Sequence, residues 1–232
     1  MKTRHPKTLQ NITKALERWG YRVWSNVLNT VDHGVPHSRQ RLYLVAILKD
    51  SVRHDFEWPK QIPLVRRVKH IINKRKGDSS KHMPALMSQK RLVLKAFRKV
   101  KKQGRNPRQV PVLIDIGCSP KFASHGVGAL PCLTATRGAT RGRGHWCSTV
   151  GRHLTLIELF QFQGFTADEA SAIMATLQSA SPGTAPNDSH VGRMLGNTMS
   201  LNVIERVLAQ ALPAAGLARG LTDPWYAASG AA

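Results

Sequence analysis

Two arginines separated by one residue stand in a polar segment directly before an apolar run. The segment at 34–41 reads GVPHSRQR and contains Arg39 and Arg41. On an extended backbone, side chains at positions i and i+2 point to the same side, so the two guanidinium groups are expected together at a strand end. A guanidinium group offers a planar fork of donors that suits phosphate oxygens or the edge of a base. A solvated strand end is the other interpretation that this segment leaves open.

A second cluster begins at Arg152, where the chain reads RHLTLIE, and continues to QGF at 163–165. Thr155 and Glu158 have the spacing of a capping box, in which each side chain binds the backbone N–H of the other residue. Gln163 and Gly164 follow where the helix would stop, because glycine commonly ends helices. Taken alone, the cluster predicts a capped helix with a basic residue before it.

A third cluster, GNTM at 196–199, precedes the last expected helix. Backbone N–H groups at a helix start can hold a carboxylate, so Gly196 and Asn197 are candidates for binding a small ligand. Ordinary helix capping explains the same residues. Each of the three clusters is therefore compatible with a binding site and with a purely structural role.

The positive charge of the chain is strong and uneven. The formal net charge is +22, and residues 1–110 contain 27 basic and 6 acidic residues, whereas residues 111–232 contain 8 and 7. Such a charge attracts polyanions through counterion release, which makes a nucleic acid the expected partner. A highly soluble surface or a disordered basic arm is the alternative. The residues we expect to contact DNA are Lys99 and, in a Gly-rich segment, Arg137, Arg141 and Arg143.

Composition places the chain among soluble intracellular proteins. Its 232 residues correspond to one large or two small domains. No apolar run approaches the roughly 18 residues of a membrane span, and the start lacks a secretory signal. The three cysteines, at 118, 132 and 147, form neither an even disulfide framework nor a CxxC pair, which indicates a reducing compartment and no metal site. The nucleus and the bacterial cytoplasm fit equally well.

The elements that would position the arginines form the closing part of an α/β sheet. Apolar residues at helical spacing predict a helix over 7–19, ended by Gly20. An extended segment follows at 21–28, and the apolar run LYLVAIL at 42–48 predicts a strand buried on both faces. A complete doubly wound sheet needs several earlier βα units, which we do not find in this sequence.

Later segments differ in character. Residues 49–111 hold 19 basic against 4 acidic residues, with a basic helix expected over 87–100 that points Leu92, Leu94 and Phe97 inward. Short strands and loops are expected over 111–150, and capped helices are expected to begin at Thr155 and Thr166. A loop at 181–189 and a final helix over 200–212 follow, with Val203, Ile204, Val207 and Leu208 on one face.

Together and in this order, the three clusters resemble the C-terminal half of a DNA (cytosine-5)-methyltransferase. In that family a GxPQxRxR segment precedes a strand, a variable target-recognition region follows, and RxLTxxExxxxQGF and Gly-Asn-(Ser/Thr)-Val come last. Here GVPHSRQR, RHLTLIELFQFQGF and GNTM occupy those places, and PCLTAT at 131–136 resembles a short element late in the recognition region. His37 stands where the family has Gln, and Met199 where it has Val.

The resemblance implies methyl transfer from S-adenosylmethionine to C5 of a cytosine flipped out of the duplex. It implies that Arg41 approaches the cytosine, that Arg39 supports the site, and that Asn197 with Gly196 reaches the cofactor. Arg152, Thr155, Glu158, Gln163 and Gly164 would organise the recognition domain. The implied fold is a partial Rossmann-like methyltransferase sheet with a smaller basic recognition domain.

The family's cofactor loop, Pro-Cys-Gln nucleophile loop and Glu-Asn-Val motif belong upstream of residue 5. The Pro131-Cys132 pair lies downstream of the arginine motif, out of place for a nucleophile. We therefore expect S-adenosylmethionine to bind, and methylation to occur, only with a complementing N-terminal segment. The alternatives are a non-catalytic DNA-binding module derived from such an enzyme and a basic RNA-associated protein.

The expected division of the chain has five parts. Residues 1–48 would end the catalytic α/β domain, and residues 49–150 would form the basic target-recognition region. Residues 151–190 would be the helical part of the recognition domain, 191–212 the returning helix of the catalytic domain, and 213–232 a flexible tail.

Overall fold

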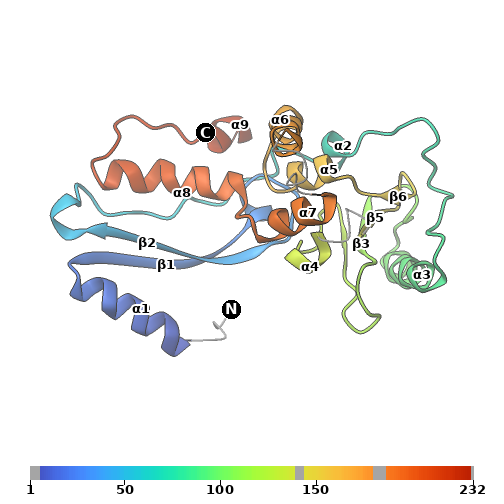
Figure 1. The fold of residues 1–232 in the computed structure, drawn as a ribbon, viewed down its shortest axis with the longest axis horizontal. Coiled ribbons are helices and arrows are strands. Elements are labelled where there is room, and N and C mark those ends of the chain that lie inside the picture. Colours follow the sequence, from blue (N-terminus) through green and yellow to red (C-terminus); the bar gives the residue numbers. More distant parts are fainter. Residues whose placement is uncertain (1–5, 139–143, 180–186, 231–232) are drawn as a thin grey trace.

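An antiparallel strand pair and a small antiparallel sheet occupy the two ends of an elongated molecule in the computed structural model (Figure 1). The structure describes residues 6–138, 144–179 and 187–230. At one end lie α1 (Pro6–Arg18), β1 (Tyr21–Asn29), β2 (Gln40–Leu48) and α8 (Leu201–Ala214). The mixed α/β character expected from the sequence is confirmed.

The opposite end is the basic region and its sheet, whose strand order is β4-β3-β5-β6. Helix α3 (Met87–Lys102) packs on this sheet, and short helices lie between the two ends of the molecule. The sheet strands are β3 (Val112–Asp115), β4 (His125–Val127), β5 (His145–Cys147) and β6 (Arg152–His153). The remaining helices are α2 (Val68–Ile71), α4 (Ala135–Gly138), α5 (Leu156–Gln161), α6 (Ala167–Gln178), α7 (Asp188–Asn197) and α9 (Pro224–Ser229).

Strands β1 and β2 pair in antiparallel register, with Trp24 opposite Val45 and Leu28 opposite Arg41. One face of the pair packs on α8 in an apolar cluster that includes Tyr43 and Ile47. The other face is half-covered, and Leu42 is 44% exposed, so the expectation that 42–48 is buried on both faces is wrong for this structure. The reason is that the described residues supply a helix layer on one face and little on the other.

Helix α1 ends as predicted, with Gly20 in the left-handed region at φ 85°. None of its residues is buried, although its apolar stripe has the spacing of a core-facing helix. Ile12 is exposed, and Trp19, directly after the helix, is 73% exposed. The apolar side of α1 therefore has no full partner in the described part of the chain.

The basic helix forms where the sequence predicts it, as α3. Leu92, Val93, Ala96, Phe97 and Val100 face the sheet. Leu94 is 40% exposed, so its expected inward position is wrong, because the buried stripe follows Val93 and Val100 instead.

The capped helices predicted to begin at Thr155 and Thr166 are confirmed. The side chain of each threonine accepts a hydrogen bond from the backbone N–H of the glutamate three residues later, and the side chain of that glutamate accepts one from the backbone N–H of the threonine. Helix α8 buries Val203 and Val207, while Leu208 is exposed. Residues 213–230, expected to be a tail, contain α9, whose Trp225 is buried. Across 6–138, 144–179 and 187–230, no helix combines the length and the apolar character of a membrane span.

Candidate functional site

Arg39 joins three segments that are far apart in the sequence. Its guanidinium group is buried and donates from Nη1 to the carbonyl of Leu133, and from Nη2 to the carbonyls of Gly196 at 3.1 Å and Thr198 at 2.8 Å. Burial, together with the Arg41 guanidinium, lowers the pKa of Arg39. The first arginine of the motif thus holds the 131–136 segment and the 196–199 cluster together.

Arg41 lies on the same side of β2 as Arg39 and Tyr43, as the i, i+2 spacing predicts. Its Nη1 donates to the Gln40 carbonyl at 2.8 Å and lies 3.7 Å from Sγ of Cys132. Unlike Arg39 it is half-exposed and makes no ion pair in the described residues. Its charge is therefore available to a ligand.

His37, within the arginine segment, is buried against the end of α5 and the 131–136 segment. Its Nδ1 lies 2.9 Å from the carbonyl of Phe162, and its Nε2 lies 3.1 Å from the backbone N of Leu133. A carbonyl only accepts and an N–H only donates, so Nδ1 carries the proton and the ring is neutral. Burial, with a contribution from Arg39, lowers the pKa of His37 to about 3. Glutamine, which the family that this chain resembles has at this position, also offers a donor (the amide NH2) and an acceptor (the amide oxygen).

Gln163 links the end of α5 to α7 and to the start of α8. Its Nε2 donates to the carbonyl of Leu195 at 3.0 Å, and its Oε1 accepts from the Ser200 hydroxyl at 3.0 Å. The backbone carbonyl of Gln163 accepts from N of Leu201 at 2.7 Å. Gly164 has φ 102°, and a Cβ there would lie 2.8 Å from the backbone N of Asn202, so a larger residue does not fit.

Gly196 and Asn197 end α7, whereas the sequence placed them at the start of the last helix. Gly196 is buried, and a Cβ on it would lie 2.4 Å from backbone atoms of Thr134 and Ala135. Its carbonyl is already used by Arg39. Asn197 is exposed, while Gly196 is buried and serves close packing.

Arg152, Thr155 and Glu158 form one hydrogen-bonded group. Arg152 binds both carboxylate oxygens of Glu158, at 2.9 and 2.7 Å, and its Nε donates to Asp78 at 3.0 Å. Glu158 also accepts from the backbone N of Thr155 at 2.8 Å, while its own backbone N–H donates to Thr155 Oγ1. The hydrogen bonds with Glu158 raise the pKa of Arg152. This group joins the loop at 73–79 to the start of α5.

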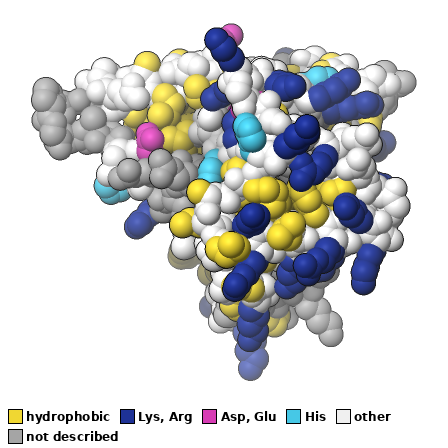
Figure 2. All heavy atoms as spheres, turned by 90° about the vertical axis from the view of Figure 1, so that its right-hand side faces the viewer, with side chains coloured by type: hydrophobic (Ala, Val, Ile, Leu, Met, Phe, Trp, Pro, Cys, Tyr) yellow, Lys and Arg dark blue, Asp and Glu magenta, His cyan; other side chains and the backbone are white. Residues whose placement is uncertain are grey.

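Of the residues expected to contact DNA, Lys99 has a described side chain, and it lies away from this site. Lys99 is exposed on α3, on the end of the molecule where Lys and Arg side chains gather (Figure 2). Arg141 and Arg143 lie outside the described residues, and the side chain of Arg137 is not described either. The structure therefore places Lys99 apart from the arginine motif.

Sequence reasoning missed a buried polar group behind the arginine segment. Asn202 donates to the His33 carbonyl at 2.7 Å, and Arg206 Nη1 lies 2.7 Å from His33 Nδ1. The only signal was a set of polar residues on the inward face of an apolar helix. Among the described residues no cluster of potential metal ligands occurs, so nothing there marks a metal site.

Comparison with known proteins gives a consistent result. Residues 1–212 match the family model described as C-5 cytosine-specific DNA methylase. Type II methyltransferase M.NgoBI of Neisseria gonorrhoeae is 28% identical over 201 residues, which cover 86% of this chain and 53% of that protein. Type II methyltransferase M.NlaX of Neisseria lactamica is 39% identical over 66 residues, covering 28% of this chain and 20% of that protein.

Among solved structures, the Entamoeba histolytica methyltransferase EhMeth superposes with a TM-score of 0.49 at 13% identity, covering 88% of this chain and 57% of that one. The chain spans about half the length of the gonococcal relative. Because the family model matches nearly all of its residues, the chain belongs to the C-5 cytosine-specific DNA methylase family.

Proposed function

We propose that this chain supplies the target-recognition part, the cytosine-facing arginine and part of the cofactor site of a DNA cytosine-5 methyltransferase. The methyl group comes from S-adenosylmethionine and goes to C5 of cytosine. A second segment, on the same polypeptide or another, supplies the cysteine nucleophile and the cofactor loop. The sheet of β1 and β2 is then the end of a Rossmann-like methyltransferase sheet.

The observation that carries this proposal is the position of Arg39. Its three carbonyl partners come from the 131–136 segment and the 196–199 cluster, which are motifs of the family resemblance. Burying a guanidinium group costs free energy unless its donors are hydrogen-bonded. The three carbonyl acceptors around Arg39 therefore hold their segments in one arrangement. That arrangement leaves Arg41 half-exposed beside Cys132.

Arg41 is the residue we assign to the flipped cytosine. A cationic donor in a site closed to water stabilises negative charge that develops on the ring when a thiolate adds to it. Asn197, exposed at the end of α7, is the residue we assign to the cofactor. Gly196 contributes by letting α7 approach the 134–135 backbone.

DNA is held in this proposal by the basic end of the molecule. Helix α3 contains seven Lys or Arg residues and no acidic residue. Its exposed side chains include Arg91, Arg98 and Lys99, none in an ion pair within the described residues. Such cations bind phosphates without reading the base sequence. From the sequence, we also assign Arg137, Arg141 and Arg143 to contacts with the DNA phosphate backbone.

The exposed apolar side of α1 and β2 is where the second segment would pack. Ile12, Trp19, Leu42 and Leu48 are exposed large apolar residues there. In the described part of the chain, β1 and β2 pair only with each other. The outer edge of each strand therefore offers backbone donors and acceptors to further strands.

Reconstitution tests the proposal. We expect this chain, mixed with a polypeptide bearing the nucleophile loop and the cofactor loop, to transfer labelled methyl groups from S-adenosylmethionine to cytosine in DNA. Arg41→Ala should lower the maximal rate about 30- to 1,000-fold, the loss of roughly 2 to 4 kcal/mol of transition-state stabilisation. Lys99→Ala should weaken DNA binding and leave the maximal rate nearly unchanged, because a phosphate contact holds ground and transition states alike.

Equal loss of maximal rate in both variants, or full activity of the Arg41→Ala protein, would refute the assignment of Arg41. DNA binding without methyl transfer in every mixture would favour the second candidate, a non-catalytic DNA-binding module. The uncompensated basic surface of α3 is the observation on which that candidate rests.

A further inference from the structure

Residues 213–230 lie beyond the stretch that matches the family model and fold back toward the arginine segment. Asp223 caps α9 by accepting from the backbone N–H groups of Trp225 and Tyr226, at 3.1 and 3.0 Å. The cap turns the chain so that the Trp225 ring packs among Val35, Ile62 and Val65. This C-terminal segment is therefore built into an apolar cluster with residues just before Arg39.

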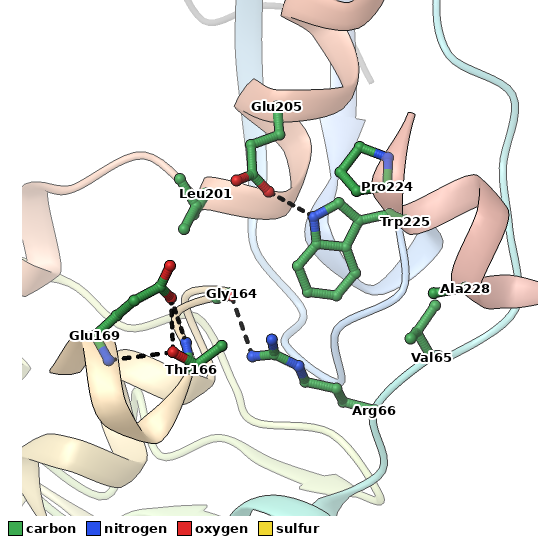
Figure 3. Close-up of a pocket in the computed structure, with 10 residues that line it drawn as sticks. All are labelled: Val65, Arg66, Gly164, Thr166, Glu169, Leu201, Glu205, Pro224, Trp225 and Ala228. Carbon is green, nitrogen blue, oxygen red and sulfur yellow. Dashed lines mark hydrogen bonds between the residues drawn. The ribbon is translucent and has the colours of Figure 1, made fainter. Parts of the chain in front are cut away.

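Gly34 shows how closely Trp225 approaches. A Cβ on Gly34 would lie 3.1 Å from the Trp225 ring, and the residue has φ 96°. The indole Nε1 donates to Glu205 on α8 at 2.6 Å, which fixes the ring orientation (Figure 3). Arg66 lies across the ring, 4.9 Å from its centroid, and donates to the carbonyls of Gly164 and Phe165.

A row of buried polar side chains makes a second connection between the C-terminal segment and the arginine segment. Asp223 Oδ2 binds Arg206 Nε at 2.7 Å, and Arg206 Nη1 lies 2.7 Å from His33 Nδ1. Arg206 is 1% exposed and, as an obligate donor, requires His33 Nδ1 to accept. Burial and the Arg206 charge lower the pKa of His33 to about 4, in agreement with a neutral acceptor ring.

The segment at 32–37 also contacts residues 62–66, which lead to the recognition region. The backbone N of Ile62 donates to the Asp32 carbonyl, and those of Val65 and Arg66 donate to the Gly34 carbonyl, each at 3.0 Å. Residues 62–66 thus run beside residues 32–34, and Trp225 covers their junction.

We propose that residues 213–230 are a C-terminal clasp, in which Trp225 and Asp223 are positioning residues that hold the 32–37 segment against residues 62–66. The clasp acts on Arg39 and Arg41 through the backbone that leads to them. It goes beyond the proposed function, because it concerns a part of the chain outside the family match and holds whether or not the chain takes part in methyl transfer.

Amide hydrogen exchange of the full chain, followed by NMR, tests the clasp. The reporters are the amides of Ile62, Val65 and Arg66, since their acceptors lie in the clasped segment. Trp225→Ala should raise their exchange rates roughly tenfold or more and leave the α3 amides unchanged, as expected for local opening. Trp225→Phe, which keeps a buried ring, should recover most of the protection. Leu217→Ala, on an exposed side chain of the same segment, is the matched control and should change nothing.

Unchanged exchange at the three reporters in the Trp225→Ala protein would overturn the clasp. If that variant loses protection everywhere, Asp223→Asn decides, because asparagine keeps a capping oxygen and removes the charge that faces Arg206. Faster exchange at the reporters with α3 still protected supports the clasp, and wild-type exchange overturns it. Failure of methyl transfer in reconstitution would leave this result untouched.

Discussion

At the scale of single residues, the motif side chains serve mainly to hold one another. Arg39 was expected to support the site rather than to meet the cytosine, and its guanidinium donors bind the carbonyls of residues 133, 196 and 198. The alternation of a strand predicts the side to which Arg39 and Arg41 point, and the structure agrees. It cannot predict which distant carbonyls lie on that side, because tertiary packing brings them there.

His37 makes stability depend on pH in a predictable direction. Its pKa is about 3 in the folded chain and 6.5 in the unfolded chain, so its contribution is complete above pH 6.5. As the pH falls from 6.5 toward 3, the unfolded chain takes up a proton that the folded chain does not. We expect the free energy of unfolding to fall by at most about 1.4 kcal/mol per pH unit from this residue.

Urea unfolding at several pH values between 7 and 5 measures this slope. His37→Gln keeps a donor for Phe162 and an acceptor for Leu133 but does not titrate. The variant should lose that part of the slope, while the contribution of His33, whose pKa is lowered to about 4, remains. Identical slopes in the two proteins would mean that His37 is not buried as a neutral ring.

At the scale of elements, periodicity predicts the helices and strands well and their surroundings less well. The helices at 6–18, 87–102 and 201–214 and the strands at 21–29 and 40–48 lie within a few residues of their predicted ranges. Burial of β2 on both faces and of Leu94 was wrong, since an apolar residue is placed inward only if another element covers it. Helix α9 was missed because its burial depends on Trp225 alone.

The capping boxes of α5 and α6 allow a matched test of how much the ion pair with Arg152 adds to the stability of a capped helix start. Glu158 is buried and binds both Arg152 and the backbone N–H of Thr155, whereas Glu169 binds Thr166 on an exposed surface. Glu158→Gln leaves Arg152 without its main partner in a part-buried site. We expect a loss of about 2 to 4 kcal/mol in the free energy of unfolding.

Glu169→Gln is the control, because glutamine also serves in a capping box and the site is exposed. Its cost should be below about 1 kcal/mol. Chemical unfolding of both variants at neutral pH measures the difference. Similar costs for the two substitutions would show that the Arg152 group adds little to an ordinary helix cap.

At the scale of the whole molecule, Lys and Arg side chains gather on the end formed by α3 and the small sheet (Figure 2). Residues 49–111 carry 19 basic and 4 acidic residues; they start beside α8, where the backbone N of Arg53 donates to the Ala214 carbonyl, and continue to α3. The sequence shows the excess of basic residues in this stretch directly, because counting charges needs no tertiary information. It could not predict the exposed face of α3, since that depends on which side of the helix the small sheet covers.

This charge distribution predicts that the chain binds duplex DNA with a steep dependence on salt. If five to eight phosphates are contacted, the logarithm of the binding constant should fall against the logarithm of salt concentration with a slope of roughly −4.5 to −7. Fluorescence anisotropy of a labelled duplex over a salt series gives the slope.

Lys99→Ala should make this slope less negative by about 1, because one phosphate contact is lost. Lys14→Ala removes the same charge from an exposed position on α1, at the opposite end of the molecule, and should leave the slope as it is. A response that is flat with salt would exclude the polyanion interpretation. Equal changes from Lys99 and Lys14 would show that net charge, rather than the α3 surface, governs binding.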